Sequence, residues 1–175
     1  MRFSYYDRLS GARQKIYRQS DAIVTLGIPR ELELGASVRD IETALEADDR
    51  ASVQRACQRL VDALNGGYRV PPAHVRILNR RPDEGDGELH GLYEPREGRS
   101  PARITAWMRT AQRAQVVAFK TFLRTLIHEL CHHLDYELFA LEETFHTEGF
   151  YKRESSLVAA LLAQRASGGA DRQVP

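Results

Sequence analysis

The segment His128-Glu129-Leu130-Cys131-His132 places two imidazoles and a carboxylate at a spacing that suits metal-dependent hydrolysis. In an α-helix, residues i and i+4 share one face, so His128 and His132 can bind the same ion. Glu129 lies about 100° around the helix, beside that ion rather than on it. There it can act as a general base toward a water that the metal activates. The spacing therefore predicts a site for one Zn²⁺ per chain, with Glu129 as the catalytic residue.

Two histidines leave such a site incomplete, because a catalytic zinc ion usually has three protein ligands. His146 is the predicted third ligand. In one continuous helix it would lie about 21 Å beyond His132, so the chain must break and fold back between Phe139 and Phe145. Nearby carboxylates are the alternative third ligands: Glu142, Glu143, Glu148 and Glu154.

Three further side chains can assist the same chemistry. Asp135 lies one turn after His132, where its carboxylate can accept a hydrogen bond from a ligand imidazole and set its tautomer. Tyr93 and Tyr151 are candidate hydrogen-bond donors to an oxyanion that develops during hydrolysis. For each of the three, an ordinary surface or packing role is the alternative.

The helices that must position these residues follow from hydrophobic periodicity. Apolar residues recur at helical spacing over residues 116–138, so the His-Glu motif lies within an amphipathic helix. Two helices are predicted before it, over about 37–45 and 49–64. A last helix is predicted over about 150–164. The first two predicted helices thus precede the predicted strands, and the last two follow them.

Three short segments read as strands, over residues 74–78, 88–93 and 102–108, because polar and apolar side chains alternate there between turn-rich loops. The sequence thus predicts an α+β domain: N-terminal helices, a small three-stranded, mainly antiparallel sheet, the zinc-binding helix and a C-terminal helix. We divide the chain into an N-terminal extension (1–35), a metallopeptidase-like domain (36–165) and a flexible tail (166–175).

The composition excludes several classes of protein. With 42% hydrophobic and 28% charged residues, the chain has the balance of a globular domain rather than of a disordered one. Its apolar runs are too short to span a bilayer, and its arginine-rich start lacks the apolar centre of a secretory signal. Cys57 and Cys131 show no pairing pattern, and reduced thiols favour a cytoplasmic location.

These features together resemble the SprT-like zinc metallopeptidases, over roughly residues 40–165. The resemblance is carried by His128-Glu129-x-x-His132, by the later His146-x-x-x-Phe150 and by Gly91-Leu92-Tyr93 before a strand that contains Ile104. It implies a zincin-like fold, in which an edge strand of the sheet aligns a peptide over the zinc helix. We expect residues 102–108 to be that edge strand. In the family a Gly follows the third histidine, whereas Thr147 follows His146 here.

The predicted function is zinc-dependent hydrolysis of peptide bonds in a peptide or protein substrate. One alternative keeps the metal without catalysis, as a zinc-stabilised module that binds a partner protein. The other is a nucleic-acid-associated protein that uses the Arg-rich stretch 96–124, which has seven basic side chains and one acidic side chain.

Overall fold

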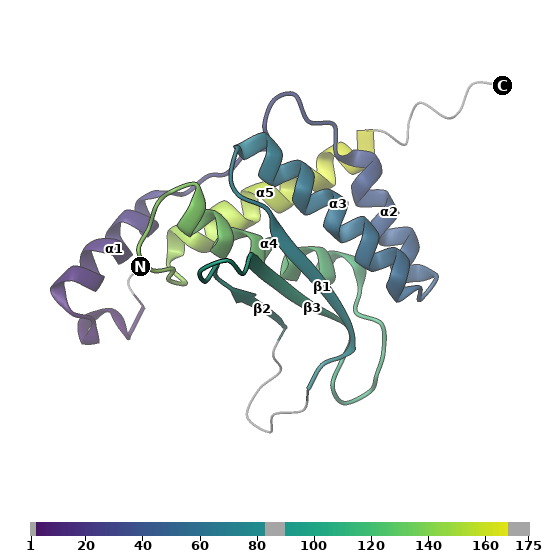
Figure 1. The fold of residues 1–175 in the computed structure, drawn as a ribbon, viewed down its shortest axis with the longest axis horizontal. Coiled ribbons are helices and arrows are strands. Elements are labelled where there is room, and N and C mark those ends of the chain that lie inside the picture. Colours follow the sequence, from purple (N-terminus) through teal and green to yellow (C-terminus); the bar gives the residue numbers. More distant parts are fainter. Residues whose placement is uncertain (1–2, 83–89, 168–175) are drawn as a thin grey trace.

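A computed structural model describes residues 3–82 and 90–167 of the chain. Within them, five α-helices, one short 3-10 helix and three strands form an α+β domain (Figure 1), which confirms the predicted class. In chain order the elements are η1 (Tyr6–Arg8), α1 (Gly11–Ala22), α2 (Gly35–Glu46), α3 (Arg50–Tyr68), β1 (Ala73–Arg80), β2 (Gly91–Glu94), β3 (Ala102–Arg109), α4 (Phe119–Glu137) and α5 (Glu148–Ser167).

The sheet is mixed, with the strand order β1-β3-β2. β1 pairs with β3 in parallel, with Val75 opposite Ile104, and β2 pairs with β3 antiparallel, with Gly91 opposite Ala106. The predictions of a mainly antiparallel sheet and of an edge strand over 102–108 are therefore wrong. The connection from β1 to β2 is long enough for β2 to skip one position, and β3 then turns back into the gap between them.

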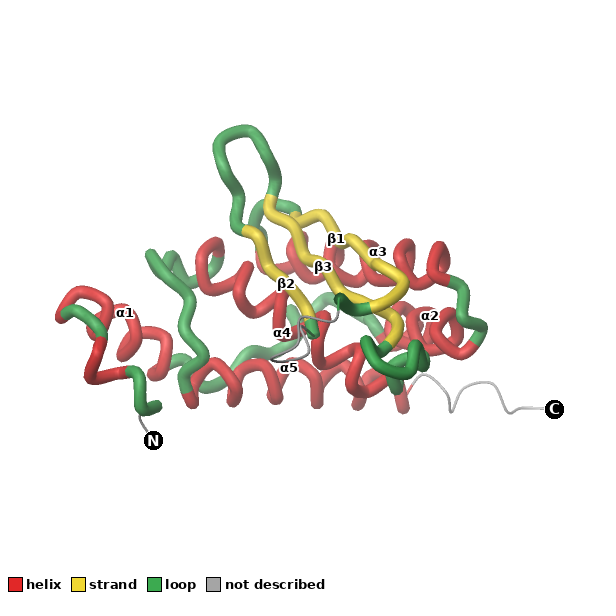
Figure 2. The backbone as a smooth tube through the Cα atoms, turned by 90° about the horizontal axis from the view of Figure 1, so that it is seen from below, coloured by secondary structure: helices red, strands yellow, loops and turns green. Residues whose placement is uncertain are grey.

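One face of the sheet packs on the helices, and Figure 2 shows the strands as a separate layer over them. The inward side chains of β1 and β3, among them Ile77 and Ile104, join a single core with Leu123 and Ile127 of α4. Each such side chain contributes about 1.5–3 kcal/mol when fully buried. This packing holds α4 firmly against the sheet, with β2 at the edge beside it.

The chain reverses sharply between α4 and α5. α4 ends at Glu137, and the backbone N–H of Leu141 donates to the carbonyl oxygen of Asp135. Ala140 adopts a left-handed backbone conformation with φ of 50°, which residues other than Gly rarely adopt. The predicted break is thus present, although neither Gly nor Pro marks it in the sequence.

The N-terminal extension contains a helix that the sequence did not predict. The side chain of Ser10 caps α1 by accepting a hydrogen bond from the backbone N–H of Arg13. α1 lies at one end of the molecule beside the start of α5 (Figure 1). Its buried residues are Ile16, Tyr17 and Ser20, a stripe too short to give a clear helical periodicity.

Two predicted segments, the C-terminal tail and the second strand, extend into residues outside the described part of the chain. Of the predicted tail 166–175, Ala166 and Ser167 belong to α5, and the rest lies outside the described residues. Glu88 and Leu89 of the predicted second strand also lie outside them. No helix in the described parts of the chain is both long and apolar enough to cross a membrane.

Candidate metal centre

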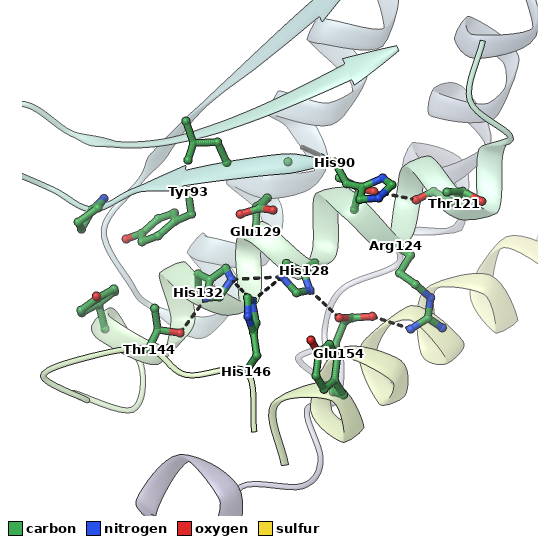
Figure 3. Close-up of a pocket in the computed structure, with 16 residues that line it drawn as sticks. His90, Tyr93, Thr121, Arg124, His128, Glu129, His132, Thr144, His146 and Glu154 are labelled. Atoms are coloured by element: carbon green, nitrogen blue, oxygen red, sulfur yellow. Dashed lines mark hydrogen bonds and ion pairs between the residues drawn. The ribbon is translucent and has the colours of Figure 1, made fainter. Parts of the chain in front are cut away.

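Three imidazole nitrogens converge in one place (Figure 3). His128 and His132 come from α4, and His146 comes from the loop before α5. The Nε2 atoms lie 2.9 Å apart for His128 and His146, 3.2 Å for His128 and His132, and 3.0 Å for His132 and His146. A tetrahedral ion with bonds of about 2.0–2.1 Å separates its ligand nitrogens by about 3.3–3.4 Å. The three histidines can therefore hold one metal ion after small outward shifts.

The hydrogen bonds behind two of these rings determine which nitrogen carries the proton. His132 Nδ1 lies 2.8 Å from Thr144 Oγ1, and that hydroxyl donates its only proton to Asp135 at 2.7 Å. His132 must then donate from Nδ1. His128 Nδ1 lies 2.8 Å from a carboxylate oxygen of Glu154, which accepts. With the proton on Nδ1, the Nε2 atom of each ring is the one that points at the other histidines, as metal binding requires.

The surroundings of the site keep His132 neutral. Burial, together with the neighbouring His128 and His146, lowers the pKa of His132 to about 2. Burial also lowers the pKa of His146. Neutral imidazole is the form that binds a metal.

Glu129 stands beside this triangle, where α4 faces β2. Its side chain is only 6% exposed, and burial raises its pKa to about 7. Gly91 of β2 lies directly against it, because a Cβ at position 91 would overlap the Glu129 carboxylate. The absence of a side chain at Gly91 therefore makes the space that the carboxylate occupies.

A cleft of about 750 Å³ opens over the histidines. β2 forms one wall with Gly91, Leu92 and Tyr93, and α5 forms the opposite wall with Tyr151 and Glu154. Glu129 and the three histidines all line this cleft, so a molecule bound in it can reach both the imidazoles and the carboxylate.

The two candidate tyrosines differ in their hydrogen bonding. The Tyr93 hydroxyl lies 3.2 Å from His133 Nδ1, and His133 Nε2 donates to the carbonyl oxygen of Pro71 at 2.9 Å. Since burial lowers the pKa of His133 and keeps it neutral, its Nδ1 accepts the Tyr93 proton. Tyr151 is 41% exposed and stacks on His146, with ring centroids 5.8 Å apart. Of the two, Tyr151 is better placed to donate into the cleft.

Three of the four carboxylates that were alternative third ligands have other partners in the structure. Glu154 supports His128 from behind and pairs with Arg124 at 2.5 Å. Glu143 pairs with Arg13, and Glu148 pairs with Lys152. Glu142 is exposed on the loop.

Asp135 acts on His132 through an intermediary rather than directly. Its second oxygen pairs with Arg153 at 2.6 Å, and both side chains are fully buried. The chain of contacts therefore runs from Arg153 through Asp135 and Thr144 to His132. Sequence reasoning missed Thr144 and Arg153, because the i+3 spacing of Asp135 suggested a direct bond.

Phe150 forms the floor of the site. Its ring lies 5.0 Å from His128, 4.7 Å from His132 and 5.3 Å from His146 between centroids. Phe150 is fully buried, so it fixes the three imidazoles from the side away from the cleft. Its position four residues after His146 was part of the sequence pattern, but its contact with all three rings was not predictable.

Part of the positive charge of the Arg-rich stretch 96–124 is paired with nearby carboxylates. Three of its arginines form ion pairs with carboxylates: Arg103 with Glu94, Arg109 with Asp48 and Arg124 with Glu154. These pairs offset part of the positive charge that a phosphate-binding surface needs.

Comparisons of the chain with protein-family models, with curated proteins and with solved structures gave no match. Its function is therefore inferred from the site itself. That site combines three converging imidazoles, a buried carboxylate beside them and a cleft that admits a second molecule.

Proposed function

We propose that this chain is a zinc-dependent peptidase of the zincin type, related in mechanism to the SprT-like enzymes it resembles. The observation that carries the proposal is the placement of Glu129 beside three histidines whose Nε2 atoms converge. Among the metals that imidazole ligands suit, a tetrahedral arrangement with one open position favours zinc.

The chemistry divides between the ion and the protein. A zinc ion at the three histidines supplies a Lewis acid that polarises a carbonyl group and lowers the pKa of water to about 7. Glu129 accepts a proton from the attacking water and returns it to the leaving amine. A carboxylate whose pKa burial raises to about 7 is well matched to both transfers near neutral pH.

The position of β2 is the reason to propose a peptide as the substrate. Among the described residues it pairs only with β3, so its other edge is available to an extended chain. Leu92 of β2 is 41% exposed and lines the cleft. A peptide that adds to this edge by backbone hydrogen bonds would cross the cleft within reach of Glu129. β2 thus takes the role that the sequence assigned to residues 102–108.

Metal analysis and chelation test this function together. Wild type is expected to hold one zinc ion per chain and to cleave an unfolded protein such as reduced casein. Removing the metal should stop cleavage, and adding zinc should restore it. His132→Ala and His146→Ala should weaken zinc binding by more than the roughly 10–100-fold that loss of an outer hydrogen-bond partner costs. Zinc without cleavage would instead favour a zinc-stabilised binding module, and no zinc would refute the metal centre.

The contact between Gly91 and Glu129 gives a separate prediction. In Gly91→Ala the new methyl group displaces the Glu129 side chain from Cγ outward, and no backbone atom is among its three nearest contacts, so the chain should still fold and bind zinc. Displacing the general base should lower kcat/KM by about 10²-fold. Gly66→Ala is the matched control, because a Cβ at Gly66 meets nothing within 4 Å. Equal activity of the two variants would show that Glu129 does not need its observed position.

A further inference from the structure

The loop that presents His146 depends on the N-terminal segment for much of its packing. Leu141 and Phe145 of this loop belong to a second hydrophobic cluster, separate from the main core. The other buried members of that cluster are Tyr6, Ile16 and Tyr17, which all come from the N-terminal segment. Without that segment, two large apolar side chains that flank the third histidine on its N-terminal side would lose their burial.

Polar contacts tie the same two segments together. The Arg13 guanidinium donates two hydrogen bonds to the Glu143 carboxylate, one of them 2.7 Å from Nε to Oε2. The Tyr5 hydroxyl donates to the backbone carbonyl oxygen of His146 at 3.0 Å. One of these contacts lies three residues before the third histidine, and the other lies on that histidine itself.

The segment also holds the chain just after His146. The Asp21 carboxylate accepts a hydrogen bond of 2.9 Å from the backbone N–H of Gly149. A Cβ at position 149 would overlap the backbone of Asp21, so the close approach of α1 requires Gly there. The loop is therefore fixed on both sides of His146 by residues of the N-terminal segment.

One buried side chain connects this docking with the support of a second ligand. The Arg153 guanidinium donates to the carbonyl oxygens of Ser20 at 2.9 Å and Ile23 at 3.2 Å. It also pairs with Asp135, whose other oxygen holds Thr144 against His132. The end of α1 is thus bonded to the group that positions His132.

His146 needs such external support more than the other two histidines. His128 and His132 project from a packed helix, and each has a hydrogen-bond partner on Nδ1. His146 is exposed and projects from a loop, so its place depends on the backbone that carries it. We propose that residues 3–23 are a positioning element that holds His146 in ligand geometry. The inference rests on the proposed metal centre but not on peptide hydrolysis.

Zinc affinity of the full-length chain, measured by competition with a chromogenic chelator, tests this. The variant Tyr5→Phe/Arg13→Ala removes both polar ties with little change to the buried cluster. It should bind zinc about tenfold more weakly, the effect expected of an outer partner. Arg59→Ala is the matched control, because it breaks an exposed Arg–carboxylate pair of 2.8 Å with Asp40, on helices away from the loop. It should bind zinc as wild type does.

A double-mutant cycle separates positioning from general stability. In a His146→Ala background, Tyr5→Phe/Arg13→Ala should cost no further zinc affinity, because the ligand it positions is gone. The visible spectrum of the Co²⁺-loaded variant should also lose intensity, as coordination by His146 weakens. Equal affinity of variant and wild type would overturn the positioning role, as would the same tenfold loss with and without His146. If wild type binds no zinc, the metal centre itself fails, which is a different result.

Discussion

Glu129→Gln is expected to lower kcat/KM for peptide hydrolysis by about 10²–10⁴-fold while the zinc content stays at the wild-type level. Gln has the shape of Glu but cannot accept a proton at neutral pH. The Glu129 carboxylate is not one of the groups that converge on the metal position, so its loss should leave the three imidazoles in place. Activity on an unfolded protein and zinc content, measured on the same preparation, check both halves.

Glu142→Gln is the matched control for this change. Glu142 is an exposed carboxylate on the loop that carries His146, and it was an alternative third ligand. Its variant should keep both zinc and activity. If Glu129→Gln remained active, the proton acceptor would have to be another group. If it lost zinc as well as activity, Glu129 would be a ligand or a structural support rather than a base.

Arg153→Leu should lower the free energy of unfolding of the metal-free protein by about 3–5 kcal/mol. Arg153 and Asp135 form an ion pair of 2.6 Å in which both side chains are fully buried. Without the guanidinium, the Asp135 carboxylate stays buried with no opposite charge, and the carbonyl oxygens of Ser20 and Ile23 lose their donor. Urea unfolding with a chelator present measures this loss apart from any effect on metal binding.

A second substitution and a pH series identify the cause of that loss. Arg153→Leu/Asp135→Asn should be more stable than Arg153→Leu alone, because the unpaired charge is removed. Burial raises the pKa of Asp135 already in the wild type. A carboxyl group with a raised folded-state pKa is destabilising when ionised, so the loss should shrink as pH falls and the group becomes protonated. A loss below about 1 kcal/mol, or one independent of Asp135, would contradict this account.

The same buried pair makes stability and site geometry interdependent. Arg153 contacts α1 and Asp135 at once, and Asp135 supports His132 through Thr144. A chain that fails to pack α1 should therefore present both His132 and His146 less accurately. The N-terminal segment and the three-histidine site thus share one network of contacts.

Much of the fold and part of the site were predictable, because they depend on neighbours in sequence. The i and i+4 spacing of His128 and His132 places both rings on one face of any α-helix. Glu129 takes its place beside them for the same reason. Hydrophobic periodicity likewise located α3, α4 and the three strands to within a few residues, since burial on one face imposes that period.

Only the tertiary structure decided what depends on contacts between distant residues. Alternation of side chains says which face of a strand is buried but not which strand is its neighbour, so the central place of β3 was not predictable. α1 buries too few side chains to give a periodic signal. Its buried side chains Ile16 and Tyr17 pack in one cluster with Leu141 and Phe145 of a loop far along the chain. The convergence of His146 with the helix-borne pair requires a reversal at Ala140 without Gly or Pro. Long-range packing stabilises that reversal, and no local pattern encodes it.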